Sequence, residues 1–460
     1  MAEKQFNKVL VANRGEIAIR VFRACYDLGL HTVAMYSNED TFSLFRTKAD
    51  EAYLIGENKS PLGAYLDIDG IIDLAKRRNV DAIHPGYGFL SENADFARAC
   101  EEEGITFIGP SSKILAQMGD KLTAKAIAKA CNVPTIPGSA EPLKDGEEAL
   151  AKAKEYGFPI ILKAAGGGGG RGMRRCDTED EVIPAFNLVK SEAKKAFGNE
   201  DIFIEKYLVE PKHIEVQILG DQYGNVVHLG ERDCSIQRRH QKLIEESPSP
   251  AIDDETREKM GAVAVKAAKA AGYYSAGTIE FLRDKHGEFY FIEMNTRIQV
   301  EHPVTEWVTG IDLIREQIRI AAGQPLTYSQ DEVQVRGHAI EVRINAEDTE
   351  HDFRPSPGTV TNVHFPGGKG VRIDSALFAG YEIPPFYDSM VAKLIVYDKN
   401  RQLALRKLRN ALGEVVLEGI KTNIDYQYEI INDPDFIAGN VDTGFIERFQ
   451  KAREENSEDD

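Results

Sequence analysis

A stretch just past the middle of the chain, residues 289–302, constrains the fold more than any other; it reads Phe-Tyr-Phe-Ile-Glu-Met-Asn-Thr-Arg-Ile-Gln-Val-Glu-His. It opens as an apolar run and then alternates, which predicts an extended strand whose successive side chains point to opposite faces. One face then carries Glu293, Asn295, Arg297, Gln299 and Glu301. A half-buried surface strand is the ordinary reading of alternation. Asparagine is depleted in strands, so we interpret this face as a row of ligand-binding and catalytic groups.

The segment upstream predicts a partner for this strand. Residues 278–282 have the composition of a strand, and 284–287 (Asp-Lys-His-Gly) have that of a turn. Folding the hairpin about this turn pairs Phe291 with Glu280, so Glu293 becomes the diagonal neighbour of Glu280, roughly 7–8 Å away. Two carboxylates at that spacing repel each other unless a cation lies between them. Oxygen ligands on a rigid hairpin are suited to Mg²⁺.

The first quarter of the chain alternates strands with helices. Strands are predicted at 8–12 and 32–36 with a helix at 16–28 between them, and this alternation predicts a doubly wound parallel sheet over residues 1–113. No Gly-x-Gly-x-x-Gly motif follows the first strand, which disfavours dinucleotide binding. The loop 84–93 (His-Pro-Gly-Tyr-Gly-Phe-Leu-Ser-Glu-Asn) follows a strand at the edge where such sheets bind ligands. A plain glycine and proline turn remains an equal alternative.

A small lobe is predicted from about 135 to 207 within a second domain spanning 114–330. Its strand at 159–162 leads into Lys163 and a glycine run that ends in Arg171-Gly. The run lacks the Gly-Lys-Ser/Thr ending of a Walker loop, and a flexible linker is the alternative. Backbone N–H groups flanked by two cations favour a phosphate cover. Consecutive glycines are costly to order, so we predict a mobile lid that closes over its ligand.

Two further polar segments of this domain are interpreted differently. Residues 237–242, Gln-Arg-Arg-His-Gln-Lys, are basic in a chain whose formal net charge is −18, so we favour an anion site over a surface charge run. The pair Glu205-Lys206 either is solvated or meets an adenine edge. A hairpin is predicted at 212–229, and its shared face of His213, Glu215 and Gln217 is interpreted as a solvated outer face.

A last domain is predicted from 331 to 450. It contains an alternating strand at 337–344 that includes Arg343, and a helix at 401–412. A strand and a helix together predict a mixed α+β domain, and the acidic composition of residues 451–460 predicts a disordered tail. A length of 460 residues is consistent with about three domains of roughly 150 residues.

Bulk properties exclude several classes of protein. The acidic net charge argues against nucleic-acid and anionic-membrane binding. The N-terminus has no apolar signal core, and no run is long enough to span a membrane. Five scattered cysteines favour reduced thiols and a cytoplasmic location over disulfides or a zinc site.

Together these motifs resemble the biotin carboxylase family of the ATP-grasp superfamily along the whole chain. The stretches that carry the resemblance are Val11–Ile17, His84–Asn93, Gly166–Met173, Glu231–Ser235, Gln237–Lys242 and Glu293–His302. The resemblance implies an α/β (α+β ATP-grasp) fold. The implied activity is that of a ligase forming a C–N bond, which carboxylates biotin with bicarbonate and MgATP via carboxyphosphate and releases ADP and phosphate.

The resemblance also implies residue roles. ATP binding falls to Lys121, Lys163, Gly169, Gly170, Glu205, Lys206, Tyr207, Leu208, His213, His240, Glu280 and Glu293. Mg²⁺ or Mn²⁺ binding falls to Glu280, Glu293 and Asn295. Bicarbonate binding falls to Lys242, Arg297, Gln299 and Val300. Glu301 is the implied base, Arg343 stabilises the biotin enolate, and Lys242 and Arg297 complete the catalytic set.

The implied partners are a biotin carboxyl carrier protein and carboxyltransferase subunits, since no Ala-Met-Lys-Met biotin attachment motif is present. A homodimer and a role in acetyl-CoA carboxylase and fatty acid synthesis are expected, with pyruvate or propionyl-CoA carboxylase as the alternative. Two other readings remain: an ATP-grasp ligase that uses another acyl or carbamoyl phosphate, and a nucleotide-sensing subunit without chemistry.

Overall fold

The computed structural model describes residues 3–168, 171–197 and 199–458. Its N-terminal part is a parallel sheet of order β3-β2-β1-β4-β5, which confirms the predicted doubly wound sheet. The strands are β1 (Lys8–Val11), β2 (His31–Tyr36), β3 (Glu51–Leu54), β4 (Ala82–His84) and β5 (Thr106–Phe107). The helices are α1 (Gly15–Asp27), α2 (Pro61–Tyr65), α3 (Ile68–Arg77), α4 (Ala94–Glu102) and α5 (Ser112–Gly119), with short 3-10 turns η1 (Asn38–Asp40) and η2 (Leu44–Thr47).

The strand order reverses between β1 and β4, which is where open α/β sheets bind ligands. Here the loops that follow the two strands are tied together. The Asn13 Nδ2 group donates hydrogen bonds to the carbonyls of Pro85 (2.7 Å) and Tyr87 (2.8 Å). The 84–93 loop is thus fixed at the edge of the sheet that faces the rest of the molecule.

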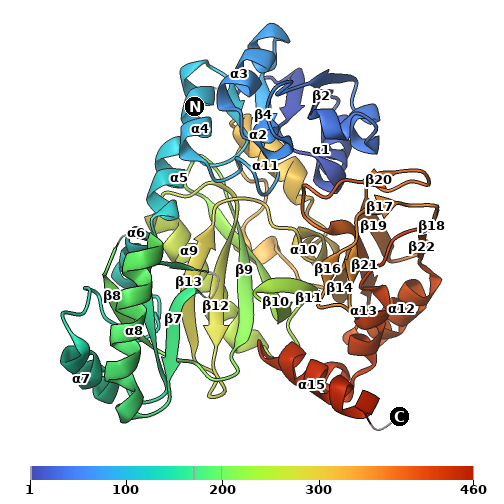
Figure 1. Cartoon of the computed structure of the whole chain (residues 1–460). Coiled ribbons are helices and arrows are strands. Elements are labelled where there is room, and N and C mark those ends of the chain that lie inside the picture. The colour runs from blue at the N-terminus through green and yellow to red at the C-terminus, as the bar shows by residue number, and fades with distance from the viewer. Residues whose placement is uncertain (1–2, 169–170, 198, 459–460) are drawn as a thin grey trace.

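One continuous antiparallel sheet, of order β13-β12-β9-β10-β11-β14-β21-β19, forms the centre of the molecule (Figure 1). Its strands are β9 (Lys212–Gly220), β10 (Val226–Arg238), β11 (Gln241–Ser247), β12 (Ser275–Arg283), β13 (Phe289–Asn295), β14 (His338–Asn345), β19 (Val371–Ser375) and β21 (Met390–Asp398). The pairing of β11 with β14 joins the predicted second and third domains within this sheet. Side chains more than 100 residues apart in sequence therefore share one rigid surface.

Helices cover this sheet. The helix α9 (Asp254–Ala270) packs on β9 and β10, α10 (His302–Thr309) on β10, β11, β14 and β21, and α12 (Arg401–Glu414) on β14 and β21. Apart from α6 and the elements of the small lobe, the other elements are α11 (Leu313–Ala321), η3 (Gln330–Glu332), β15 (Glu347–Asp348), β16 (Arg354–Pro355), β17 (Gly358–Thr359), β18 (Asn362–His364), β20 (Glu382–Ile383), β22 (Val416–Glu418), α13 (Ile424–Asn432), α14 (Pro434–Ala438) and α15 (Phe445–Glu458). Among the described helices, none combines the length and apolarity that a membrane span needs.

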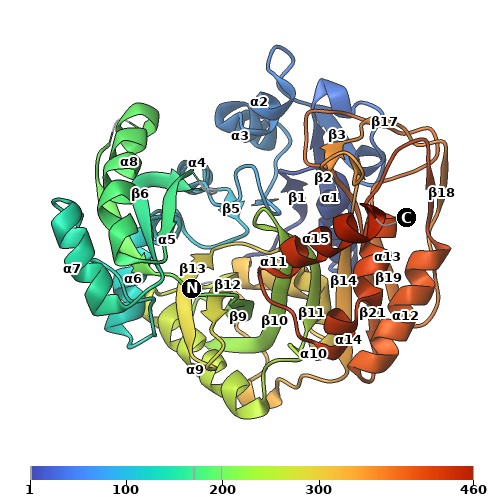
Figure 2. The same ribbon diagram turned by 60° about the horizontal axis from the view of Figure 1, so that its bottom comes forward.

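The small lobe has its own sheet and core, and Figure 2 shows it standing beside the central sheet. Its strands β6 (Ile160–Gly168), β7 (Arg171–Cys176) and β8 (Ile202–Lys206) pair in the order β7-β6-β8, and α7 (Gly146–Tyr156) and α8 (Glu179–Phe197) cover them. The helix α6 (Lys121–Ala130) precedes the lobe. The connecting segment bridges Thr135 to Phe291 of β13 and Gly138 to Glu205 of β8. Gly169 and Gly170 lie outside the described residues, so the lid hypothesis stays a prediction.

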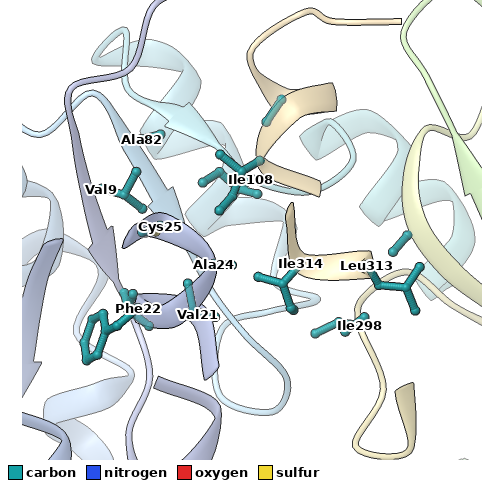
Figure 3. Packing of buried hydrophobic residues seen from close by; sticks show 14 of the residues in the cluster. Val9, Val21, Phe22, Ala24, Cys25, Ala82, Ile108, Ile298, Leu313 and Ile314 are labelled. Carbon is teal, nitrogen blue, oxygen red and sulfur yellow. The ribbon is translucent and has the colours of Figure 1, made fainter. Parts of the chain in front are cut away.

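A shared hydrophobic core joins the N-terminal sheet to the central one. Figure 3 shows Val21 and Ala24 of α1 with Leu313 and Ile314 of α11 and with Ile298 in the same cluster. Each of these side chains is buried. Ile298 lies between Arg297 and Gln299 and faces away from the predicted row of functional groups, so its burial anchors that segment to the core.

Three predictions about the backbone are wrong. The strand predicted through Glu301 ends at Asn295. Glu293 pairs directly with Glu280 rather than diagonally. Phe291 pairs with Phe281 instead of the predicted Glu280, and a bulge that leaves Ile292 without a partner moves the register by one further residue. The acidic tail is not disordered over the described residues, because α15 continues to Glu458; residues 459 and 460 lie outside them.

Candidate active site

A cavity of about 1430 Å³ lies where the small lobe, the central sheet, the 84–93 loop and the C-terminal segment meet. It gathers most of the predicted site residues. Those that line it are Lys163, Glu205, Lys206, Tyr207, Leu208, His213, His240, Lys242, Glu280, Glu293, Asn295, Arg297, Gln299, Val300 and Arg343. Glu301 is fully buried beneath the lining. The side chain of Lys121, at the start of α6, is not among the described ones.

The β12–β13 hairpin supplies a set of oxygen ligands. Glu280 and Glu293 face each other across it, and Asn295 Nδ2 donates a 2.9 Å hydrogen bond to Glu280 Oε1. His213 Nε2 lies 3.1 Å from Glu280 Oε2. Burial would raise the pKa of Glu280, but Lys242 and His213 outweigh it and hold that pKa well below the usual value. Paired carboxylates beside an amide are the donor set that Mg²⁺ prefers, so these residues fit that ion.

The ammonium group of Lys242 is the point at which three carboxylates converge. Its Nζ lies 2.6 Å from Glu215 Oε2, 3.1 Å from Glu280 Oε1 and 2.7 Å from Glu301 Oε1. Burial would lower the pKa of Lys242, but the three carboxylates raise it well above its ordinary value. A cation held charged in a water-poor site binds a small anion far more strongly than a surface lysine does.

Glu301 is held between two cations. Besides Lys242, Arg343 Nη2 lies 3.1 Å from Glu301 Oε2. Burial would raise the pKa of Glu301, but Lys242, Arg343 and Arg232 outweigh it and keep the carboxylate ionised. The same Arg343 guanidinium also contacts Glu245 at 2.6 Å, and burial raises the pKa of Glu245 to about 7. The site therefore holds an ionised carboxylate that can accept a proton beside cations that can bind anions.

The segment 296–301 has no ladder hydrogen bonds of its own strand, and side chains from elsewhere hold it. Glu92, from the 84–93 loop, accepts hydrogen bonds from the Thr296 amide (3.1 Å) and from Arg297 Nε (2.9 Å). Arg297 Nη2 also donates to Asn295 Oδ1 at 3.2 Å. The 84–93 loop thus positions Arg297. This contact favours the interpretation of the loop as part of a ligand site over that of a plain turn.

Sequence reasoning missed a buried polar network under the cavity. The outer face predicted for residues 212–229 is wrong: Glu215 and Gln217 are fully buried. Arg232 is also fully buried; it contacts Glu215 Oε1 at 2.5 Å, Gln217 Oε1 at 2.7 Å and Thr278 Oγ1 at 3.1 Å. No alternation marks this network in the sequence: β10 runs on to Arg238 rather than ending at Leu229, and this extension pairs Arg232 with Glu215.

Replacing Arg232 with Met should destabilise the protein by about 3–5 kcal/mol, because the change leaves Glu215 buried with one cation fewer. Urea unfolding of the purified variant measures this. Replacing Glu215 with Gln in the same chain should recover part of the loss, since it removes the uncompensated charge. A loss below about 1 kcal/mol, the worth of a surface ion pair, would contradict the account.

The predicted nucleotide end of the cavity has a different character. Lys163 and Lys125 both pair with Glu205, and they outweigh burial to lower its pKa. Lys206 Nζ donates to the carbonyls of Gly157 and Phe158 at 2.8 Å each, so it is tied to the lobe. His240 lies in a tight turn with φ of 64°. Strained backbone of this kind in a non-glycine residue recurs at ligand sites.

The C-terminal segment also contributes to the cavity wall, which no sequence signal predicted. Thr443, Ile446 and Arg448 line the cavity. The helix α15 packs against β10, and Arg448 Nη1 lies 3.0 Å from Glu210 Oε1 (Figure 1). An acidic composition near the end of a chain gave no hint of this, because the contact depends on tertiary packing.

Comparison with known proteins gives matches along nearly the whole chain. Family models described as biotin carboxylase N-terminal domain, carbamoyl-phosphate synthase L chain ATP-binding domain and biotin carboxylase C-terminal domain match residues 5–115, 120–329 and 341–448. A biotin carboxylase of Nostoc sp. is 54% identical over 447 residues, which are 97% of this chain and 100% of that protein.

Two further matches come from Hydrogenobacter thermophilus. The 2-oxoglutarate carboxylase small subunit is 53% identical over 99% of this chain and 97% of its own length. A crystal structure of the biotin carboxylase domain dimer of 2-oxoglutarate carboxylase, in complex with MgADP, ADP and bicarbonate, superposes with a TM-score of 0.90 at 54% identity. The alignment covers 97% of this chain and 98% of that one.

Proposed function

The chain belongs to the biotin carboxylase family, and we propose from this premise how its residues divide the work of carboxylating biotin. The reaction takes MgATP, bicarbonate and biotin and gives carboxybiotin, ADP and phosphate. The observation that supports the assignment of roles is the meeting of Lys242, Glu301 and Arg343 beside the oxygen-ligand hairpin. Such a site can bind bicarbonate, take its proton and lie open to the nucleotide.

Phosphate release from MgATP, with bicarbonate and free biotin each supplied or withheld, tests this function. We expect release that needs bicarbonate and rises with biotin. Another ATP-grasp ligase would release phosphate only with a different acceptor, and a nucleotide-sensing subunit would bind ATP without turnover. Either of those two outcomes would overturn the proposal.

Bicarbonate binds between Lys242 and Arg297, with Gln299 and the backbone of Val300 completing its contacts. Glu301 removes its proton, since that carboxylate is ionised and lies 2.7 Å from the lysine that attracts the anion. The deprotonated bicarbonate attacks the terminal phosphate of ATP, forming carboxyphosphate and ADP. Phosphate released from carboxyphosphate takes the proton of the biotin ring nitrogen, Arg343 stabilises the enolate charge left on biotin, and that nitrogen bonds to the carboxyl carbon.

At the nucleotide end, Lys163, Glu205, Lys206, Tyr207, Leu208, His213 and His240 bind ATP, together with Lys121 and the glycine loop through Gly169 and Gly170. The carboxylates of Glu280 and Glu293 and the amide of Asn295 would hold Mg²⁺ or Mn²⁺. A bound ion of this kind neutralises phosphate charge and orients the terminal phosphate. The protein contributes the rigid pairing of Glu280 with Glu293, which fixes where that charge lies.

Replacing Glu293 with Gln should raise the Mg²⁺ concentration needed for half-maximal phosphate release. We expect an increase above the roughly tenfold that loss of an outer-sphere partner of a metal site causes, because a hard cation prefers charged oxygen. Excess Mg²⁺ should restore activity only in part. The exposed Glu288 on the same hairpin gives a matched control, and Glu288→Gln should leave the Mg²⁺ requirement unchanged. Unaltered metal dependence in the Glu293 variant would exclude this site.

The organisation of the wider enzyme is also part of the proposal. We assign residues 1–113, 114–330 and 331–450 to an N-terminal, an ATP-grasp and a C-terminal domain, with a lid over about 135–207. The chain is proposed to act in the cytoplasm as a homodimer, which the dimer of the Hydrogenobacter relative supports. Sedimentation of the purified chain tests the dimer.

A biotin carboxyl carrier protein and a carboxyltransferase are the proposed partners. We propose acetyl-CoA carboxylase as the whole enzyme, and similarity to a 2-oxoglutarate carboxylase subunit supports a keto-acid acceptor as the second candidate. Transfer of labelled carboxylate to acetyl-CoA, pyruvate, propionyl-CoA or 2-oxoglutarate in an extract that supplies the partner chains distinguishes these acceptors.

A further inference from the structure

Lys393 is a fully buried cation on β21 that touches the backbone of the proposed bicarbonate segment. It lies directly opposite Arg343 in the register of β14 and β21. Its Nζ donates a 2.8 Å hydrogen bond to the carbonyl oxygen of Val300. That carbonyl belongs to the peptide group that joins Val300 to Glu301. Lys393, which lies opposite Arg343 on the neighbouring strand, therefore holds the peptide group that leads into Glu301, the proposed base.

Two carboxylates fix the ammonium group in place. Glu16 Oε1 of α1 lies 3.3 Å from Nζ, and Asp374 Oδ2 of β19 lies 3.9 Å away. Burial would lower the pKa of Lys393, but Glu16, Glu341 and Asp374 outweigh it and raise that pKa, so the group stays charged. Buried charges persist in proteins only when they are paired. Lys393 thus links the N-terminal sheet, the bicarbonate segment and the strand beside Arg343.

The segment that Lys393 touches depends on such contacts. The strand β13 ends at Asn295, so the backbone from 296 onward lacks a ladder partner. Glu92 holds its first two residues, the burial of Ile298 anchors its middle, and Lys393 satisfies the carbonyl of Val300. A carbonyl that has left the ladder needs another donor, and the buried ammonium group that serves here also sets the direction of the Val300–Glu301 peptide.

We propose that Lys393 is a positioning residue: it fixes the Val300–Glu301 peptide and thereby aligns the bicarbonate segment and its base with Arg343. The proposal rests on the proposed function of this cavity. Lys393 is too deep to meet a substrate, because its side chain is fully buried. Its effect must pass through the backbone of its neighbours.

The test replaces Lys393 with Met in a chain that also carries Glu16→Gln, and compares this double variant with Glu16→Gln alone. Glu16→Gln removes the carboxylate that Lys393→Met would leave without its cation. Asp374 still has a cation, because Arg372 lies 2.7 Å from it. We expect kcat/KM for bicarbonate to fall roughly 10²-fold, the cost of a small misplacement at a reacting centre. The KM for ATP should change less than about twofold, since the nucleotide contacts are untouched.

Lys407→Met is the matched control. Lys407 Nζ also donates to a strand carbonyl, that of Tyr397 at 2.7 Å, and pairs with Asp398 at 2.9 Å, but at the far end of β21. This variant should lower thermal stability and leave the bicarbonate and ATP constants as they are. A purely structural role for Lys393 would make the two lysines behave alike.

The outcomes separate the two proposals. If the unmodified chain releases no bicarbonate-dependent phosphate from MgATP, the proposed function itself fails. If that chain is active and the folded Lys393 variant keeps a normal bicarbonate constant, or loses bicarbonate and ATP binding in parallel, the positioning role is overturned. Should the double variant not fold, Lys393→Arg replaces it. That variant keeps the charge but moves the donor, so an unchanged bicarbonate constant would equally overturn the role.

Discussion

Replacing Glu301 with Gln is expected to lower kcat for biotin carboxylation by roughly 10²–10⁴-fold, the contribution of a well-placed general base, while the KM for ATP stays close to its original value. The amide keeps the size and most contacts of the side chain but cannot accept the bicarbonate proton. Because Glu301 is fully buried beneath the cavity, no carboxylate dissolved in the buffer can take over its role as the base. Initial rates of phosphate release at saturating MgATP and bicarbonate measure the effect.

Glu246→Gln provides the control for this prediction. Glu246 is also a buried carboxylate held by two cations, with His338 Nε2 at 2.6 Å and Arg401 Nε at 2.7 Å, but it does not line the cavity. Loss of its charge should lower stability and leave kcat of the folded protein nearly unchanged. Near-normal carboxylation by the Glu301 variant would end the assignment of the base, whatever the control shows.

The row of polar groups at 293–301 was predictable even though its backbone was not. Alternation sorts side chains between two surroundings in any extended backbone. Arg297 and Gln299 accordingly line the cavity while Ile298 enters the core. The end of the strand at Asn295 depends on its partner, because Asn295 pairs with Thr278 near the start of β12. That partner and its length are tertiary facts that the local sequence does not contain.

The bulge at Ile292 illustrates the same limit at the scale of one residue. The turn at 284–287 is where the sequence places it, since Asp284 Oδ1 accepts hydrogen bonds from the amides of His286 (2.8 Å) and Glu288 (3.0 Å). The pairs next to the turn already differ from the prediction by one residue, since Phe291 pairs with Phe281, and the unpaired Ile292 shifts every later pair by one more. Glu280 and Glu293 are therefore direct partners in the structure, closer together than the predicted diagonal pair, and this favours a cation shared between them more strongly.

Burial was the property that sequence reasoning judged least well. Glu215, Arg232 and Lys393 are charged residue types that are ordinarily exposed, and each is fully buried here. Each is buried next to a group of opposite charge, as Arg232 is beside Glu215 and Lys393 beside Glu16. These pairs form only when segments distant in sequence become neighbours in the folded protein. The resemblance to a known family implied roles for residues that line the cavity, but it gave no role to these supporting residues.

Lys242→Ala should raise the KM for bicarbonate on the order of 10²-fold, as truncating one member of a buried charged pair costs 2–5 kcal/mol or more. The ammonium is the cation that Glu215, Glu280 and Glu301 share, so its loss leaves the anion site dominated by carboxylates. Bicarbonate would then enter against a negative potential. The KM for ATP should rise much less, and an effect confined to ATP would move Lys242 to the nucleotide site.

Arg239→Ala is the control from the same basic segment. Arg239 pairs with Asp352 at 3.0 Å, and both side chains are about two-thirds exposed. Exposed pairs contribute about 1 kcal/mol or less, so the bicarbonate constant should change less than about fivefold. A similar loss in both variants would mean that the overall charge of the segment attracts bicarbonate rather than Lys242 itself.

The pH dependence of the Lys242 variant gives an independent check on the same arrangement. Burial raises the pKa of Glu301, and among the opposing cations Lys242 lowers it most. Removing Lys242 should therefore raise that pKa. A base acts only while it is ionised, so activity is lost as pH falls through its pKa, and a higher pKa moves this acid limb to higher pH. The profile of kcat/KM for bicarbonate should shift upward in Lys242→Ala, whereas in Arg239→Ala it should stay where it is in the unmodified enzyme. An unshifted limb in the Lys242 variant would show that Lys242 and Glu301 do not interact in the working enzyme.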